Sequence, residues 1–195
     1  MDLAGLSPQS LRSRDSLLKV KEASKHSQSN NLLTAPVLKE IKGATGLMMS
    51  AFKYVKAHGI QTESQYPYTA RNGRCQDTQQ TPTFTLKGFS DVPQGDSDQL
   101  AAAVSQRVVS IAIEADTEVF QFYSEGVIDS ADCGTDLDHG VAAVGYGSEN
   151  GKDFWIVRNS WGSNWGDKGY VKILKQQGRG AGVCGITQLA SYPIA

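Results

Sequence analysis

The chain has 195 residues, enough for one good hydrophobic core or two small ones. Its 39% hydrophobic and 20% charged residues and its net charge of −1 are typical of an ordinary globular protein, without the basic excess expected of a nucleic-acid-binding protein. The longest apolar runs are too short to cross a membrane. The amino terminus has no apolar signal core, so nothing in the sequence as written directs the chain to secretion.

The first part of the chain differs from the rest in composition. Residues 1–42 are polar and contain no aromatic side chain, which predicts disorder or weak helix. Residues 47–58 then place Met48, Phe52 and Val55 at helical spacing ahead of a glycine, which predicts a helix that ends there.

Beyond this helix the apolar period changes from helical to alternating. Ser97 is expected to cap a second short helix, which continues to about residue 106. The pattern predicts a brief helix or loop at 117–126 and strands at 108–115, 139–147, 153–160 and 169–174. The segment Glu149-Asn150-Gly151-Lys152 predicts a hairpin between two of these strands, because Asn-Gly is the strongest short hairpin signal. The carboxyl-terminal half is therefore mainly antiparallel β-structure.

All three tryptophans lie in the segment "FWIVRNSWGSNWGDKGY". Trp155 fits a strand core, since it sits among the apolar residues of a predicted strand. Trp161 and Trp165 occur in a loop rich in glycine and asparagine, where they serve no periodic core. Indole rings in such a loop are interpreted as the wall of a site or as a shield over a hydrogen bond.

A single histidine precedes the short apolar run in "LDHGVAAVGYG", and by itself it would be interpreted as structural. Together with "WIVRNSWGSNWGDKGY", however, this block resembles the histidine and asparagine blocks of the papain-like cysteine peptidases, most closely the cathepsin L-like branch. Further similar blocks are "GLMMSAFKYVKAHGIQTESQYPY", "DVPQGDSDQLAAAV" and "CGITQLASYPIA", so the resemblance covers residues 43–195. It implies a papain-like α+β fold, with a helical-lobe remnant at 43–95 and a β domain at 96–195.

The resemblance assigns catalytic roles to two residues. His139 corresponds to the general base of the family and Asn159 to the residue that orients it, with Trp161 covering their hydrogen bond. The chemistry is reasonable because an adjacent imidazolium lowers the pKa of a thiol from about 8.5 to roughly 3–4. The histidine then returns a proton to the leaving amine.

The nucleophile of the family has no counterpart in the sequence. It would lie near residue 4, in a "CGSCW"-like segment, but no cysteine precedes Cys75. The oxyanion-hole glutamine and the long central helix are also missing. By resemblance, Cys133 and Cys184 match a disulfide of the β domain, whereas the partner of Cys75 is replaced by Gly43. Cys75 is therefore interpreted as an unpaired disulfide half rather than a relocated nucleophile.

The resemblance also implies a set of substrate-binding residues. They are Thr45, Gly46, Leu47, Met48, Ala112, Leu137, Asp138, Trp161 and Leu189. Peptides or proteins are the implied substrates, and a propeptide or inhibitor is a further possible partner. No cofactor, metal ion, nucleic acid or membrane is implied. Family members are lysosomal or extracellular.

Three hypotheses about function follow. The first is a truncated family member that is inactive alone. The second is a non-catalytic pseudo-peptidase that binds a peptide or an inhibitor, and the third is an enzyme whose cysteine-bearing segment comes from another chain. Without the central helix, the helix at 47–58 is expected to expose Met48, Phe52 and Val55 and to favour aggregation or a partner.

Overall fold

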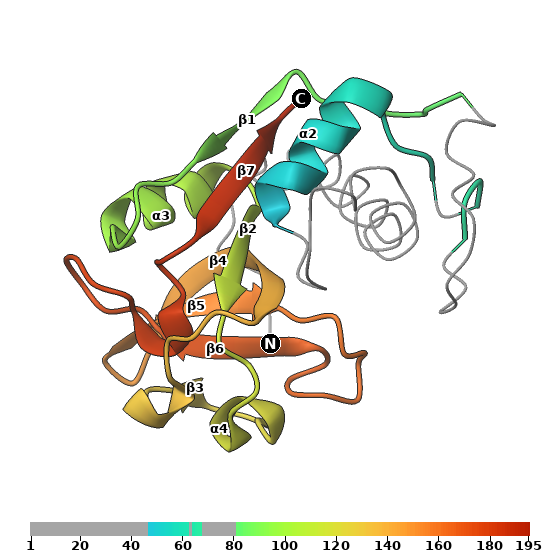
Figure 1. Ribbon diagram of the computed structural model, residues 1–195. Coiled ribbons are helices and arrows are strands. Elements are labelled where there is room, and N and C mark those ends of the chain that lie inside the picture. The colour runs from blue at the N-terminus through green and yellow to red at the C-terminus, as the bar shows by residue number, and fades with distance from the viewer. Residues whose placement is uncertain (1–46, 63, 68–80) are drawn as a thin grey trace. The chain divides into compact units, whose positions relative to one another are not determined.

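The computed structural model describes residues 47–62, 64–67 and 81–195 (Figure 1). Its contacts divide the chain into two compact units, Met1–Ser90 with Pro193–Ala195, and Asp91–Tyr192. Among the helices in the described ranges, none is long and apolar enough to cross a bilayer.

In the first unit, the predicted helix is present as α2 (Met48–His58). It ends at Gly59, whose φ of 74° is left-handed and whose N–H donates to the Val55 carbonyl. The expected exposure of its apolar residues is wrong for Met48 and Phe52, which are both 8% exposed. Phe52 is covered because its ring packs against that of Phe89, with centroids 5.9 Å apart.

Helix α3 (Ser97–Gln106) is the first helix of the second unit, and it begins one residue earlier than predicted. The cap is Asp96 rather than Ser97, because the Asp96 carboxylate accepts a hydrogen bond of 3.0 Å from the Gln99 N–H. Ser97 is instead the first helical residue and is buried. Leu100 and Val104 lie on the buried face of α3 and join the core.

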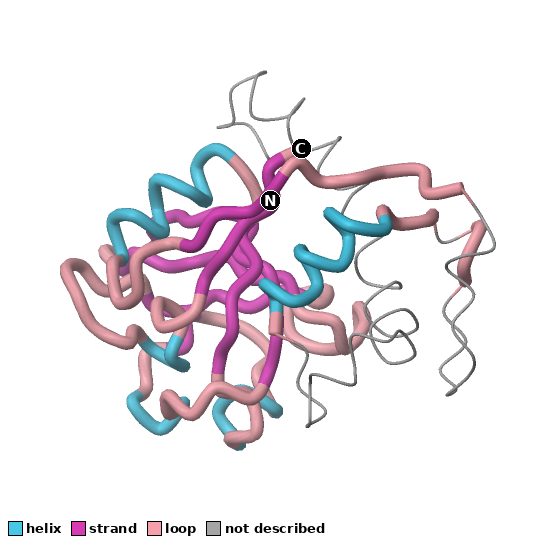
Figure 2. Tube along the Cα trace, turned by 45° about the horizontal axis from the view of Figure 1, so that its top comes forward, coloured by secondary structure: helices cyan, strands magenta, loops and turns pink. Residues whose placement is uncertain are grey.

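The strands form one sheet in the order β1-β7-β2-β4-β5-β6-β3. Their bounds are β1 (Gly88–Asp91), β2 (Val109–Ile113), β3 (Val127–Ile128), β4 (His139–Glu149), β5 (Lys152–Arg158), β6 (Tyr170–Leu174) and β7 (Ala190–Ile194). The pairs β2–β4, β2–β7, β4–β5 and β5–β6 are antiparallel, and β3–β6 is parallel. In Figure 2 the strands of the second unit lie side by side. The predicted α+β class is confirmed.

Three short helices complete the second unit, namely α4 (Glu118–Gln121), η3 (Ala131–Cys133) and η4 (Val183–Gly185). The predicted hairpin is confirmed, since Glu149 pairs with Lys152 across a two-residue turn. Asn150 and Gly151 have φ values of 53° and 76°, as a type I′ turn requires. The sequence did not predict β1, β3 or β7, because these short strands carry no clear alternation.

The core of the second unit lies on one face of the sheet. Every second residue of β2 is fully buried, namely Val109, Ile111 and Ile113. Trp155 of β5 is also 0% exposed, which confirms its interpretation as a core residue. The alternating pattern of β2 therefore places its other face, with Ala112, toward the surface.

Candidate active site

His139 is the first residue of β4, and two hydrogen bonds hold the backbone at this point. It pairs in register with Ile113, the last residue of β2, and the Asp138 N–H donates to the Ile113 carbonyl at 3.1 Å. The Asp138 carboxylate accepts from the Ala115 N–H at 2.8 Å. The backbone that carries the imidazole is therefore fixed by the end of a neighbouring strand.

Asn159 directly follows β5 and lies at the same end of the β4–β5 pair. It is only 3% exposed, and its backbone N–H donates to the Gly169 carbonyl at 2.9 Å. This hydrogen bond brings together the two ends of the loop between Asn159 and Gly169. A polar side chain buried in this way needs hydrogen-bond partners, since an unsatisfied one costs stability.

The two side chains form a hydrogen bond between His139 Nε2 and Asn159 Oδ1 of 2.8 Å. The Ser160 backbone N–H also donates to Asn159 Oδ1, at 2.7 Å. Because a backbone N–H only donates, this atom is the amide oxygen, and His139 Nε2 must carry the hydrogen. In the neutral ring the lone pair then lies on Nδ1, which is the nitrogen able to accept a proton.

Trp161 lies beside the imidazole, with ring centroids 5.2 Å apart and planes inclined by 31°. It is 42% exposed, and its ring also contacts Phe120 and Trp165. The interpretation of Trp161 and Trp165 as loop residues that wall a site therefore agrees with their position. Sequence reasoning missed Phe120, a fully buried ring whose only sequence signal is its place in the apolar segment "VFQFY".

The predicted disulfide between Cys133 and Cys184 is confirmed, and it joins η3 to η4. Both cysteines are fully buried. The Cys184 carbonyl accepts a 2.9 Å hydrogen bond from the Glu114 N–H, next to the strand end that holds Asp138. The disulfide thus lies among the contacts that build the histidine end of the sheet. The remaining cysteine, Cys75, is outside the described residues.

Some of the expected substrate-binding residues come together around this end of the sheet. The half-buried Ala112 pairs in register with Gly140, the residue after His139. Its N–H donates to the Leu189 carbonyl at 2.9 Å. The half-buried Leu137 packs so closely on Gly185 that a Cβ there would lie 2.7 Å from the leucine Cδ2.

Four further expected substrate-binding residues, Thr45, Gly46, Leu47 and Met48, stay predictions. Leu47 is the N-cap residue of α2 and is 49% exposed, while Met48 begins the helix and is buried. Both belong to the first unit. Thr45 and Gly46 lie outside the described residues.

Residues 13–194 match the papain family cysteine protease. The match begins upstream of residue 43, where the similarity in sequence blocks begins. Together with the relatives described next, it shows that the chain belongs to the papain family of cysteine proteases.

Similar sequences occur in plants. The KDEL-tailed cysteine endopeptidase CEP2 of Arabidopsis thaliana is 51% identical over 151 residues, which are 76% of this chain and 42% of that protein. The probable cysteine protease RD21B of the same plant is 50% identical over 151 residues, or 32% of its own length. The chain thus spans less than half the length of these curated relatives.

Solved structures confirm the papain-like fold. The bromelain protease of Ananas comosus in complex with the E64 inhibitor aligns with a TM-score of 0.76 and 30% identity, over 95% of this chain and 89% of bromelain. The digestive procathepsin L 3 of Tenebrio molitor larval midgut aligns with a TM-score of 0.76 and 38% identity, over 96% of this chain and 62% of that one. The Amb a 11 cysteine protease of ragweed pollen was solved in its proform, and it aligns with a TM-score of 0.77 and 33% identity over 95% of this chain and 59% of its own.

Proposed function

We propose that this chain carries the general-base half of a cysteine peptidase site. The observation that supports the proposal is the 2.8 Å hydrogen bond from His139 Nε2 to the buried Asn159 Oδ1. The Ser160 N–H donates to the same oxygen, so the imidazole is held in one tautomer. In this tautomer Nδ1 carries the lone pair and can accept a proton. In this role His139 is the base and Asn159 is the residue that orients it.

The proposed chemistry of His139 is a proton transfer in two directions. Nδ1 accepts the proton of a nucleophilic thiol, and the resulting imidazolium stabilises the thiolate next to it. After the thiolate has attacked the peptide carbonyl carbon, Nδ1–H gives the proton to the leaving amine nitrogen as the carbon–nitrogen bond breaks. Asn159 accepts from Nε2–H throughout and adds no charge to the pair.

We further propose that this chain does not hydrolyse peptides by itself. Its sequence has three cysteines, of which Cys133 and Cys184 are joined to each other. Cys75 matches a disulfide position of the family rather than the nucleophile. Without a thiolate near Nδ1, the histidine has no proton to remove, and only residual acceleration from binding is expected.

An epoxide probe of the E64 type, used together with a fluorogenic peptide, tests this proposal. The full chain, His139→Ala and Cys75→Ser are compared for covalent labelling and for peptide hydrolysis. We expect no labelling and no turnover in any of them. Labelling at Cys75 that disappears in His139→Ala would overturn the proposal, whereas activity that appears only after a second, thiol-bearing chain is added would favour an enzyme completed in trans.

The alternative function is a pseudo-peptidase that binds a peptide, a propeptide or an inhibitor without cleaving it. The partly exposed Trp161 beside His139 favours this alternative, because such an indole provides contact area for a ligand. Titration of the chain with a peptide aldehyde, measured by isothermal calorimetry, is the test. Saturable binding that is lost in Trp161→Ala would support it, and no saturation up to millimolar peptide would exclude it.

The confirmed disulfide supports a location for this chain. A buried disulfide persists in oxidising surroundings and is rare in the cytosol. We therefore propose a lysosomal or extracellular environment, as for the family. Mass spectrometry of the natural protein under alkylating conditions tests this, since unmodified and alkylated Cys133 distinguish the bonded and the reduced form.

A further inference from the structure

The indole over the histidine depends on other rings for its position. Trp161 lies in a loop whose neighbouring residues Ser160, Gly162, Ser163 and Asn164 are all exposed. Its ring contacts in the described part of the chain are His139, Phe120 at 5.5 Å and Trp165 at 5.2 Å. The indole is 42% exposed, so the protein covers only part of its surface. Its orientation therefore follows from Phe120 and Trp165.

Trp165 is held more firmly than Trp161. Its indole N–H donates to the Gln121 carbonyl at 2.9 Å, across 44 residues of chain. Its ring packs on Phe120 at 5.0 Å and on Tyr123 at 5.8 Å. Trp165 thus couples the loop after Asn159 to the segment around α4, and the Tyr123 ring packs against it.

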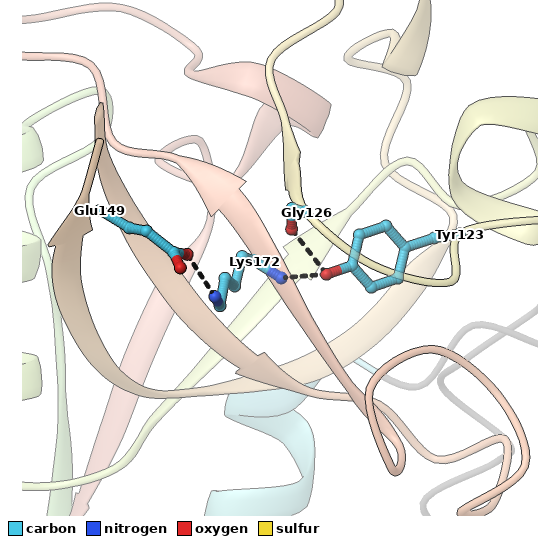
Figure 3. A network of polar contacts seen from close by, with 4 residues as sticks. All are labelled: Tyr123, Gly126, Glu149 and Lys172. Carbon is cyan, nitrogen blue, oxygen red and sulfur yellow. Dashed lines mark hydrogen bonds and ion pairs between the residues drawn. The ribbon is translucent and has the colours of Figure 1, made fainter. Parts of the chain in front are cut away.

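Tyr123 is itself fixed by two hydrogen bonds at its hydroxyl group (Figure 3). The hydroxyl donates to the Gly126 carbonyl at 2.7 Å and accepts from the backbone N–H of Lys172 at 3.3 Å. The first bond closes the turn before β3, and the second ties that turn to β6. Burial raises the pKa of Tyr123 above its usual value, so the hydroxyl keeps the proton that it donates to Gly126.

Gly166, the residue after Trp165, has no side chain, and this allows the Tyr123 ring to approach the backbone of the loop. Gly166 has a left-handed φ of 56°, and a Cβ there would lie 3.1 Å from the ring of Tyr123. The tyrosine ring therefore packs directly against the backbone of the tryptophan loop. The side chain of Lys172 also links β6 to β4, because its Nζ forms an ion pair of 2.6 Å with Glu149 (Figure 3).

We propose that Tyr123 is a positioning residue of this site, which acts through Trp165 to hold Trp161 over the His139–Asn159 hydrogen bond. The rings contact one another in turn, from Tyr123 to Trp165, then to Trp161 and His139, and all four belong to the second unit. Loss of the hydroxyl releases the turn at Gly126 and loosens the tyrosine ring. The indole then covers the His139 N–H less well, and water reaches it more often.

The role proposed for His139 underlies this inference, but the measurement needs neither a peptide nor turnover. Its readout is the exchange with water of the His139 Nε2–H proton, followed by NMR in the full chain labelled with 15N-histidine and 15N-tryptophan. His139→Gln assigns the ring signal, and Trp161→Phe assigns the indole signal. A failure to hydrolyse peptides therefore leaves this test unaffected.

The test variant is Tyr123→Phe, which keeps the ring and removes only the hydroxyl. Tyr146→Phe is the matched control, because Tyr146 lies on the same strand as His139 but is 45% exposed and contacts Trp155 instead. We expect the His139 N–H to exchange on the order of threefold faster or more in Tyr123→Phe, with a shifted Trp161 indole signal. The buried Trp155 signal is expected to stay in place, and Tyr146→Phe to match the parent chain.

A purely structural role for Tyr123 predicts lower stability with no change at His139. An unchanged His139 exchange rate and Trp161 signal in folded Tyr123→Phe would therefore overturn the proposal. If Tyr123→Phe loses the native Trp155 signal, Trp165→Phe gives the same readout, since it keeps a ring but loses the N–H donated to Gln121. Exchange at the parent rate in that variant would equally overturn it.

Discussion

The two ends of the β4–β5 pair are fixed by different kinds of interaction. At one end, Asn150 and Gly151 turn the chain with two left-handed residues, and the turn is complete within four positions. At the other end, His139 meets Asn159 in a set of hydrogen bonds and ring contacts that join residues far apart in the sequence. The turn therefore depends on local backbone preference, whereas the histidine end depends on residues from across the unit.

Removal of the disulfide is expected to cause the largest loss of unfolding free energy. Cys133→Ala together with Cys184→Ala removes a cross-link over a separation of 51 residues. On the chain-entropy relation the loss of unfolding free energy is about 4 kcal/mol. Chemical denaturation of the parent and the double variant measures it, and the His139 ring signal reports the site. A loss below about 1 kcal/mol would show that this long-range cross-link is not important for the stability of the unit.

Asn159→Ala is expected to have the next largest effect. It removes the acceptor of both His139 Nε2–H and the Ser160 N–H in a buried position, which costs about 1–3 kcal/mol. The exposed Asn164 of the same loop provides the matched control, because Asn164→Ala removes an amide that faces water. Urea denaturation compares the two variants. Equal stability of Asn159→Ala and Asn164→Ala would show that the amide does not hold this end of the sheet.

The residues of the site could be predicted from the sequence better than their geometry. His139, Asn159 and Trp161 stand in two recognisable blocks, and the hairpin follows from Asn-Gly alone. The choice of Nε2 as the hydrogen-bonded nitrogen could not be predicted, because it depends on the Ser160 N–H in the folded loop. The positioning role proposed for Tyr123 could not be predicted either, since the sequence does not reveal that Tyr123 lies against Gly166, 43 positions later.

The helices were likewise predictable only where their signals are local. Period and composition predicted α2 and α3, since their apolar spacing is local. The cap of α3 was misplaced because Asp96 and Ser97 are both good caps, and only the folded backbone selects the carboxylate. The burial of Phe52 was missed because it depends on a contact with Phe89, which is distant in the sequence.

Gly151→Ala tests whether the hairpin turn depends on local backbone preference alone. A Cβ at this position would meet no atom within 4 Å, so the cost is the left-handed φ of 76° alone, about 1–2 kcal/mol. Gly140→Ala is the control next to His139, where a Cβ is equally free and φ is not left-handed. We expect Gly140→Ala to be close to neutral, and the His139 ring signal to be unchanged in Gly151→Ala. A shifted ring signal in Gly151→Ala would show that the two ends are coupled.

The smallest expected effect concerns the ion pair between Lys152 and Asp129, beside the hairpin. The hydrogen bond from Lys152 holds the pKa of Asp129 below its ordinary value of 3.8. The folded state therefore favours the charged carboxylate, so any stabilisation is present above that value and is lost as the pH falls through the lowered pKa. Because both side chains are exposed, water and salt screen the pair, and the effect is small at neutral pH.

Asp129→Asn measures this contribution through thermal unfolding at several pH values. We expect the variant to be slightly less stable than the parent at pH 7 in low salt, and the difference to vanish both at acid pH and in about 1 M salt, where charges are screened within about 3 Å. Asp132→Asn controls for net charge, because Asp132 is an exposed aspartate of the neighbouring η3. A pH-independent difference for Asp129→Asn would mean that the side chain acts through packing at this end of the sheet, and the contrast with the long-range histidine end would then be weaker.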